Sequence, residues 1–312
     1  MLYFNASSGE TVLSGLTNEN SDMLMRSIFQ IDKNTTRLDL GWNNFDKRPN
    51  CELQRALSHL NNQIKFVTLR GNSLGKKSGE DAVLVFSSLK YATHVDLSFN
   101  DLNLQNRLDI GLKSFASTQV TSLDLSSNHL GFNDNKQLNK AVTGLTGLKS
   151  LKMSYNKLDK KSEEELEALC SAFPINLEHL DISNNNLGSK INAIRKLPKT
   201  IASLNISDND IAQLAIEDIH NLNDSLTHLQ TLYISIDEFH KMSSKQQKAW
   251  KPILSAINKV VFLDSAEKEV IPELSLFSIN RSVFFSRNCE KKEHDIVEPL
   301  KNFAKSIADN LR

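Results

Sequence analysis

Apolar residues recur along the chain in a short motif, and each copy is separated from the next by a longer stretch of mixed polarity. Residues 38–45 read LDLGWNNF, residues 67–74 read VTLRGNSL, and residues 95–102 read VDLSFNDL. The shared pattern is L-x-L-x-x-N-x-L, where x is any residue. Self-similarity at a fixed period of about 20 to 50 residues indicates a repeat architecture in which each copy is one structural unit.

Seven copies of this motif are clear, and two weaker copies follow them. The asparagines of the clear copies are Asn43, Asn72, Asn100, Asn128, Asn156, Asn185 and Asn209, which are 29, 28, 28, 28, 29 and 24 residues apart. The eighth copy has Leu232, Ile234 and Phe239, with Asp237 in the asparagine position, and the ninth has Val260 and Phe262, with Ser265 in that position. The repeats therefore extend over residues 35–265.

Each position of the motif has a physical reason. The two apolar residues that flank one x lie on the same face of a short strand, because side chains alternate with period two, and the residue between them faces outward. The asparagine follows the strand, where its amide can donate to and accept from backbone groups that a buried turn would leave unpaired. Stacked copies are therefore expected to form a ladder of asparagines.

The stretches between the motifs predict one amphipathic helix per repeat. Leu53, Leu57 and Leu60 show the helical spacing of apolar residues in one such stretch. No single repeat can bury both its strand and its helix, so stability must come from the stack and from caps at its ends. We expect an N-terminal cap over residues 1–34 and a C-terminal cap over residues 266–312 that ends in a helix. The short interval before Asn209 predicts an abbreviated or 3₁₀ helix there.

The motif resembles the leucine-rich repeat, and its long period is similar to that of the ribonuclease-inhibitor-like class. This resemblance implies an α/β solenoid of horseshoe shape, with parallel strands on the concave face and helices on the convex face. The regular repeats and the asparagine- and lysine-rich sequence also resemble translocated effectors of intracellular bacteria such as Legionella. The resemblance implies a monomeric, non-catalytic module whose concave face captures a host protein or a second bacterial effector, or inhibits an enzyme by covering its active site.

Composition and charge narrow the classes of function. The chain has 312 residues with 37 basic and 37 acidic side chains, so no net charge favours nucleic acid. No apolar run approaches the roughly 20 residues of a membrane helix. The first residues lack the pattern of a cleaved secretory signal, so we expect a cytoplasmic location in the producing cell, with translocation into the host cytosol implied by the resemblance. The cysteines Cys51, Cys170 and Cys289 form neither a disulfide framework nor a zinc pattern.

The outward positions of the repeats supply the candidate partner-binding residues. The large rings are Trp42, Phe99, Tyr155 and Tyr233, at positions where the motif does not require burial. A broken acidic row contains Asp96, Asp124 and Asp181, with His94 and His179 one pleat away and with Arg70 and Lys152 interrupting it. Aromatic residues and arginine dominate binding hot spots. The alternatives are that the rings pack on neighbouring residues along the sheet and that the aspartates are a solvated part of the scaffold.

The sequence contains no recognisable catalytic motif, so we expect no enzyme, no catalytic residue and no cofactor. There is no nucleophile elbow, zinc-protease helix, phosphate-binding loop or dinucleotide glycine pattern. His94 and His179 are three repeats apart, which is about 14 Å by strand spacing and too far for one metal ion. One alternative comes from the resemblance, because some proteins of the ribonuclease-inhibitor-like class activate small GTPases with an arginine, for which Arg70 would be the candidate.

Overall fold

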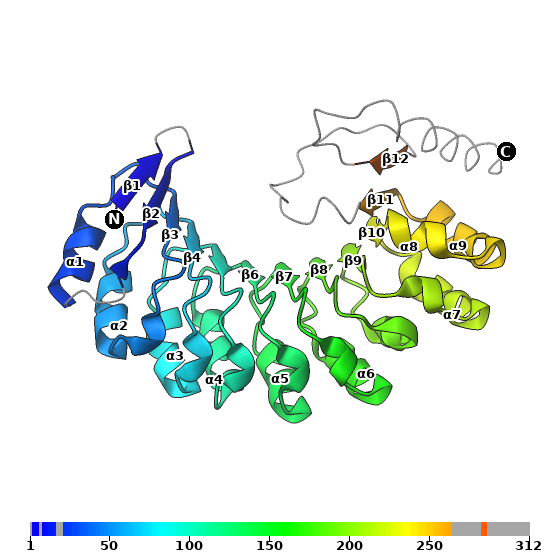
Figure 1. The fold of residues 1–312 in the computed structure, drawn as a ribbon, viewed down its shortest axis with the longest axis horizontal. Helices are drawn as coiled ribbons and strands as arrows, with labels where there is room; N and C mark the ends of the chain where they lie inside the picture. The colour runs from blue at the N-terminus through cyan, green and yellow to red at the C-terminus, as the bar shows by residue number, and fades with distance from the viewer. Residues whose placement is uncertain (1, 6–7, 17–20, 264–281, 286–312) are drawn as a thin grey trace.

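The protein forms one curved array in which all strands belong to a single sheet, ordered as in the chain (Figure 1). The structure is a computed structural model and describes residues 2–5, 8–16, 21–263 and 282–285. The first two strands are antiparallel, and every later pair of neighbours is parallel. The strands line the concave side of the array and the helices its convex side, which confirms the predicted α/β solenoid.

The strands are short and evenly spaced along the chain. They are β1 (Leu2–Asn5), β2 (Glu10–Leu13), β3 (Arg37–Asp39), β4 (Phe66–Thr68), β5 (His94–Asp96), β6 (Ser122–Asp124), β7 (Ser150–Lys152), β8 (His179–Asp181), β9 (Ser203–Asn205), β10 (Thr231–Ser235), β11 (Lys259–Leu263) and β12 (Ser282–Phe285). We call each strand from β3 onward, with its asparagine turn and the following helix, a rung, so that β3 belongs to the first rung and β11 to the ninth.

Helices connect the strands. The α-helices are α1 (Ser21–Phe29), α2 (Asn50–Ser58), α3 (Gly79–Phe86), α4 (Leu108–Lys113), α5 (Asn135–Thr143), α6 (Glu163–Ala172), α7 (Ile216–Leu226), α8 (Ile236–Lys241) and α9 (Ser244–Ala256). The 3₁₀ helices are η2 (Phe45–Lys47), η3 (Leu74–Lys76), η4 (Leu102–Leu104), η5 (Ser114–Ser117), η6 (Leu130–Phe132), η7 (Leu158–Lys160), η8 (Gly188–Lys196) and η9 (Ile211–Gln213). The sixth rung has η8 in place of an α-helix, as its short interval predicts.

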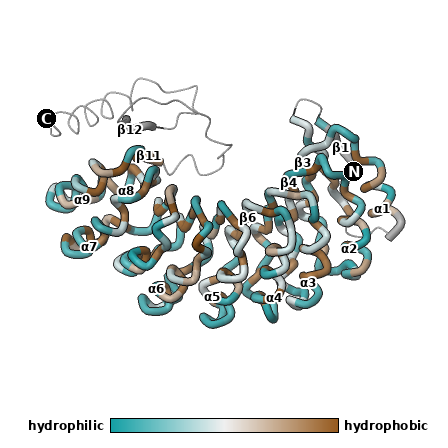
Figure 2. The backbone as a smooth tube through the Cα atoms, turned by 180° about the vertical axis from the view of Figure 1, so that it is seen from behind, coloured by the Kyte–Doolittle hydropathy of each residue, from teal (hydrophilic) through white to brown (hydrophobic). Residues whose placement is uncertain are grey.

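Equivalent residues of successive rungs lie side by side. Leu38 pairs with Val67, Val67 with Val95, and Val95 with Leu123. This register places the apolar residues of all strands in one core, which runs without interruption from Leu13 to Phe262. The helices alternate between hydrophobic and hydrophilic stretches (Figure 2), because only one stripe of each helix faces this core.

The asparagines form the predicted ladder. All seven are at most 1% exposed. The Nδ2 of Asn100 donates to the carbonyls of Leu69 and Leu97, both at 2.9 Å, and its Oδ1 accepts from the N–H groups of Asn72 at 3.0 Å and Leu74 at 3.2 Å. Each amide therefore joins its own rung to the rung before it. This satisfies buried backbone groups that a side chain without hydrogen-bonding atoms would leave unpaired.

The N-terminal cap extends both the sheet and the ladder. Strand β2 pairs in parallel with β3, and the amide of Asn43 donates to the carbonyl of Leu13 and accepts from the N–H of Leu16. Besides helix α1, this part of the chain contains the antiparallel hairpin of β1 and β2, which the sequence pattern does not predict. The predicted C-terminal cap at 266–312 and Ser265 of the ninth copy lie outside the described residues, apart from the backbone of β12.

The ladder continues into the eighth rung through a carboxylate. Glu238, not Asp237, occupies the asparagine position, because its side chain accepts hydrogen bonds from the N–H groups of Asn209 and Asp210. The prediction of Asp237 was wrong because β10 runs directly into α8, which moves the acceptor one residue along the chain. Glu238 is 7% exposed, and burial raises its pKa to about 7, with a further contribution from Asp208.

Candidate protein-binding surface

Two residues with left-handed backbone flank each of the seven ladder asparagines. The residues before the asparagine are Trp42, Gly71, Phe99, Ser127, Tyr155, Asn184 and Asp208, and those after it are Asn44, Ser73, Asp101, His129, Lys157, Asn186 and Asp210. All have φ between 50° and 67°. With the asparagine buried between them, each rung presents two side chains at the rim of the sheet, where the strands end. Glycine, asparagine and aspartate suit this backbone, whereas bulky residues rarely adopt it.

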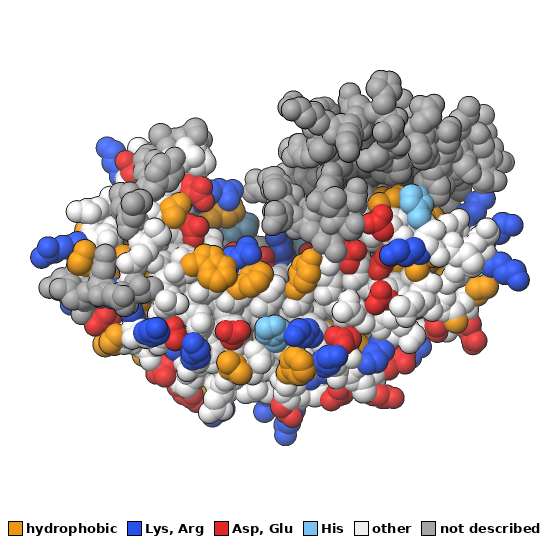
Figure 3. All heavy atoms as spheres, viewed as in Figure 1, with side chains coloured by type: hydrophobic (Ala, Val, Ile, Leu, Met, Phe, Trp, Pro, Cys, Tyr) orange, Lys and Arg blue, Asp and Glu red, His pale blue; other side chains and the backbone are white. Residues whose placement is uncertain are grey.

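The two rows of flanking side chains form the walls of a groove. The groove has a volume of about 600 Å³ and extends from the first rung, at Trp42 and Asn44, to the sixth, at Asn184 and Asn186. Hydrophobic side chains lie in a row along the middle of this face, above a row of charged and histidine side chains (Figure 3). We call this feature the ladder groove, because the buried asparagines run beneath it.

Trp42, Arg70 and Phe99 come together at one end of the ladder groove. The indole of Trp42 is 63% exposed and lies against Gly71, where an added Cβ would be 2.3 Å from a ring carbon. The ring centroids of Trp42 and Phe99 are 6.1 Å apart, and the guanidinium carbon of Arg70 lies 4.4 Å from the centroid of the Phe99 ring. The rings of Trp42 and Phe99 therefore fit both hypotheses in part, because they pack on neighbouring residues and also remain exposed to a partner.

Tyr155 lies on the same wall two rungs beyond Phe99, and both rings are more than 40% exposed. On the opposite wall, the Nζ of Lys157 lies 5.6 Å from the centroid of the Phe132 ring. Phe132 and Leu104, at the ends of neighbouring 3₁₀ helices, are also exposed and extend the apolar surface away from the sheet. Sequence reasoning missed these two, although they share one position of the repeat.

Large and small residues alternate from rung to rung along the ladder groove. The first, third and fifth rungs carry Trp42, Phe99 and Tyr155, whereas the second and fourth carry Gly71 and Ser127. The second and fourth rungs also have Gly75 and Gly131 three residues after the asparagine, where an added Cβ would be 1.8 Å and 1.9 Å from a backbone oxygen of the next rung. Over these five rungs the structure thus repeats in pairs.

Each aspartate of the acidic row is the last residue of its strand and accepts a hydrogen bond from the turn that follows. The carboxylates of Asp96, Asp124 and Asp181 accept hydrogen bonds, at 2.8–2.9 Å, from the N–H group two residues further along the chain. Burial raises the pKa of Asp96 and of Asp181, and the charge of Asp124 raises that of Asp96 further. Lys152 lies 3.8 Å from Asp124. These geometries favour a structural role for the aspartates, which is the alternative that the sequence left open.

The remaining predicted residues lie away from the ladder groove. His94 and His179 are three strands apart, with Ser122 and Ser150 between them in register. Tyr233 is half-buried on β10, and burial raises its pKa. Arg70 does not belong to the acidic row, since Thr68 holds the outward position of β4.

A second aromatic cluster, of which sequence reasoning found only His94, lies at the opposite ends of β3, β4 and β5. The rings of Phe66 and His94 stack with centroids 4.2 Å apart, and the guanidinium carbon of Arg37 lies 3.8 Å from the Phe66 centroid. These residues share the first position of their strands, which the repeat leaves unconstrained. The concave face of the first rungs is therefore bordered by aromatic side chains on both edges.

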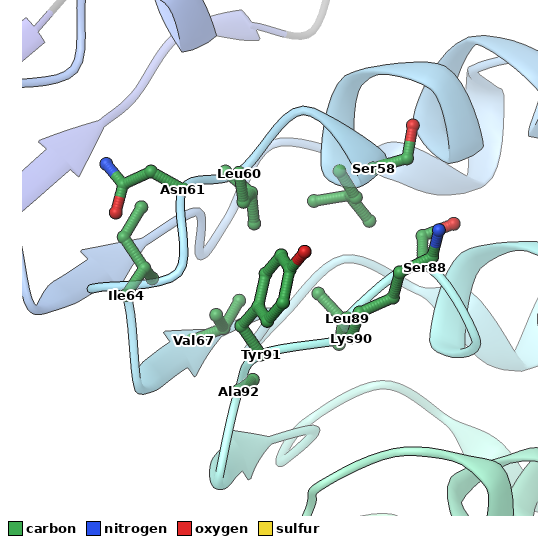
Figure 4. Close-up of a pocket in the computed structure, with 11 residues that line it drawn as sticks. Ser58, Leu60, Asn61, Ile64, Val67, Ser88, Leu89, Lys90, Tyr91 and Ala92 are labelled. Carbon is green, nitrogen blue, oxygen red and sulfur yellow. The ribbon is translucent and has the colours of Figure 1, made fainter.

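Other potential sites in the described part of the chain offer little chemistry. No three His, Cys, Asp or Glu side chains there could hold a metal ion, and none of its helices could cross a membrane. Cys51 is exposed, Cys170 is buried with its pKa raised to about 12 by burial, and Cys289 lies outside the described residues. The cavity beneath Tyr91 (Figure 4) has a volume of about 10 Å³, which is room for about one water molecule.

Known proteins with the same kind of repeat were found among family models and among solved structures. Two family models described as Leucine Rich Repeat match residues 176–197 and 116–131. No curated protein sequence matches the chain. Among solved structures, the leucine-rich repeat-containing protein LegL7 from Legionella pneumophila is similar, with 25% identity over 86% of this chain and 94% of that chain and a TM-score of 0.58. The asparagine ladder, the two family matches and this similarity identify the chain as a leucine-rich repeat protein that resembles LegL7.

Proposed function

We propose that the protein is a non-catalytic interaction module that captures a partner protein along the ladder groove and the adjoining concave face. The observation that carries this proposal is the placement of Trp42, Phe99 and Tyr155. These rings remain exposed, and they occupy left-handed backbone positions that smaller residues fill in the rungs between them. Neither burial nor backbone preference accounts for them, whereas aromatic anchors beside an arginine are typical of binding hot spots.

The double substitution of Trp42 and Tyr155 by alanine is expected to weaken partner capture by about 100-fold, because it removes two hot-spot rings. The two rings are exposed, so the melting temperature should change little. The measurement is an affinity pull-down from host and bacterial lysates with immobilised wild-type and variant protein, quantified by mass spectrometry.

Ile175→Ala provides the matched control for this experiment. Ile175 is 76% exposed and follows α6, away from the ladder groove, so its loss should leave capture unchanged. A double variant that captures every partner as well as the wild type would contradict the proposal. A matching fall in melting temperature would show that the rings serve packing instead.

The similarity to LegL7 supports a bacterial origin of the function. We propose that the protein acts as a translocated effector, either by recruiting a host protein or by covering the active site of an enzyme. An open groove on a rigid stack suits both roles, since the side chains that contact a partner are held by a continuous core.

Arg70→Ala separates binding from the alternative of GTPase activation. The Arg70 guanidinium lies on the Phe99 ring, so its removal should weaken partner binding by about 3- to 30-fold through the loss of one cation–π contact and one charge. An activator would instead lose a factor of about 1,000 in stimulated hydrolysis while still binding its GTPase. Measuring both affinity and GTP turnover with the captured partner distinguishes the two.

A further inference from the structure

We propose that Glu238 is a proton-dependent switch, which in its protonated form holds the eighth and ninth rungs on the asparagine ladder and in its ionised form weakens their attachment. This switch goes beyond the proposed function, because it acts on the stack itself and lies past the sixth rung, where the ladder groove ends. It follows from the hydrogen bonds of one buried side chain, from the charges around it and from its place in the ladder.

An asparagine of the ladder both accepts and donates hydrogen bonds between rungs. In the seventh rung, the Oδ1 of Asn209 accepts from the N–H groups of Asn185 at 3.1 Å and Leu187 at 3.4 Å. Its Nδ2 donates to the carbonyls of Ile182 at 3.0 Å and Ile206 at 3.1 Å. Bonds in both directions are possible because an amide carries an acceptor and a donor side by side.

Glu238 reproduces only the accepting half of this pattern when it is ionised. Its Oε1 accepts from the N–H of Asp210, and the side chain also accepts from the N–H of Asn209. The second oxygen, Oε2, is buried and has no hydrogen-bond partner among the described residues. A carboxylate has no proton to donate, whereas a protonated carboxyl carries one O–H group. The neutral form is therefore the one that resembles the asparagine amide.

The surroundings of Glu238 disfavour its negative charge. Its side chain is almost completely buried, and a buried charge without a partner is costly. Asp208 and Asp210, which flank Asn209 in the seventh rung, repel a second negative charge. Two elements packed against α8, η9 and β10, carry no acidic or basic side chain, and the phenol of Tyr233 on β10 is neutral, since burial raises its pKa.

The remaining ionisable neighbours lie on α8 itself and on α9. They are Asp237, His240, Lys241, Lys245, Lys248 and Lys251. The strongest influences on Glu238 are burial and the acidic side chains of the seventh rung, and they raise its pKa to about 7. The proton is therefore bound or lost within the neutral pH range.

The junction between the seventh and eighth rungs is the place where this proton has its effect. Strands β9 and β10 pair over three residues, whereas β10 and β11 pair over five, so the last two rungs hold to each other over a longer ladder than to the seventh. Gln246 of α9 also crosses the junction, because its Nε2 donates to the carbonyls of Ala212 at 2.9 Å and Leu214 at 2.8 Å. This amide does not titrate, so the pH dependence of the junction comes from Glu238.

Hydrogen exchange measured peptide by peptide on the full chain tests the switch. The opening equilibrium of residues 236–263 is their exchange rate divided by the intrinsic rate at the same pH. It should rise by about 30-fold between pH 5.5 and pH 8, because the pKa of Glu238 falls from about 7 to its ordinary value of 4.5 when the junction opens. Glu238→Gln should change by less than about threefold, since its amide supplies the same acceptor and adds a donor.

Two controls accompany this measurement. Glu217→Gln replaces an exposed glutamate of α7, in the seventh rung, and should keep the pH dependence of the wild type. Residues 94–152, in the third to fifth rungs, show whether the effect is local. Their exchange should be the same in the wild type and in Glu238→Gln at each pH.

Trp250 gives a second measurement that does not depend on hydrogen exchange. It is fully buried in α9, and Trp42→Phe leaves it as the only tryptophan of the chain. In this variant at pH 8, the urea midpoint from Trp250 fluorescence should lie below the midpoint from circular dichroism. The two midpoints should coincide at pH 5.5, and also at pH 8 once Glu238→Gln is added, because coincident probes indicate one cooperative transition.

Three results would overturn the inference. They are an opening equilibrium of residues 236–263 that does not change between pH 5.5 and pH 8, a Glu238→Gln variant that keeps the pH dependence of the wild type, and an equal response of residues 94–152. The last result would assign the effect to the whole array. Partner capture plays no part in these experiments, so their failure would leave the proposed function untouched, and a failure of partner capture would leave the switch untouched.

Discussion

Replacing Asn100 with alanine is expected to destabilise the protein by about 3–5 kcal/mol, which is a large part of the stability of a typical domain. The substitution removes a fully buried amide from the middle of the ladder. It leaves the N–H groups of Asn72 and Leu74 without a partner, whereas the carbonyls of Leu69 and Leu97 lose one hydrogen bond each and keep those from the amides of Asn72 and Asn128. Each buried group without a partner costs about 1–3 kcal/mol, and the methyl group of alanine replaces none of the lost bonds.

The urea midpoint of unfolding measures this effect. Asn106→Ala is the matched control, because Asn106 is an exposed asparagine of the same rung and should change the free energy of unfolding by less than about 0.5 kcal/mol. A loss of less than about 1 kcal/mol in Asn100→Ala would mean that water or a shift of the backbone replaces the ladder bonds, and that the asparagine is not the main link between rungs.

Replacing Glu238 with glutamine is expected to remove the part of the pH dependence of the free energy of unfolding that this buried carboxyl causes. The folded-state pKa of Glu238 is raised to about 7 from an ordinary value of 4.5, so the folded protein binds more protons than the unfolded chain between these pH values. The stabilising effect of the protonated side chain is therefore fully present below about pH 4.5 and is lost as the pH rises through 7. At pH 8 the buried carboxylate should lower the free energy of unfolding by about 3 kcal/mol relative to the glutamine variant, because each unit of the pKa shift corresponds to about 1.4 kcal/mol.

Thermal unfolding of wild type and variant from pH 5 to pH 8 tests this prediction. The difference between the two proteins isolates Glu238 from the aspartates, whose raised pKa values contribute to both. The variant should be more stable than the wild type at pH 8, because a glutamine supplies the same acceptor oxygen to Asn209 and Asp210 without a charge. Parallel curves across this pH range would show that the carboxylate is solvated instead of buried.

Most of the fold could be predicted from the sequence because the repeat leaves little freedom. The alternation of Leu38 and Leu40 sets the buried face of a strand, and the spacing of the asparagines sets the register between strands. The β1–β2 hairpin could not be predicted, because residues 2–13 have no copy elsewhere in the chain to reveal their pattern.

The candidate site could be predicted in part. The positions of Trp42, Phe99 and Tyr155 in the motif indicate exposure, and their side chains are exposed. The sequence does not reveal that these positions are left-handed, since glycine fills only one of the seven and the usual signal for such a backbone is absent. Without that conformation, the second wall of the groove, which includes His129 and Lys157, could not be placed opposite the rings.

Rungs that carry a large ring alternate with rungs that carry Gly75 or Gly131, and this alternation limits how repeats can be added or removed. A duplication or deletion of one rung would place a ring next to a ring, or a side chain where Gly75 or Gly131 must leave room for the neighbouring backbone. A change by two rungs, such as the 56 residues from Asn72 to Asn128, would preserve both patterns. In the first five rungs the pair is therefore the unit that can be added or removed without a clash, and an engineered version should change this part of the array by even numbers of repeats.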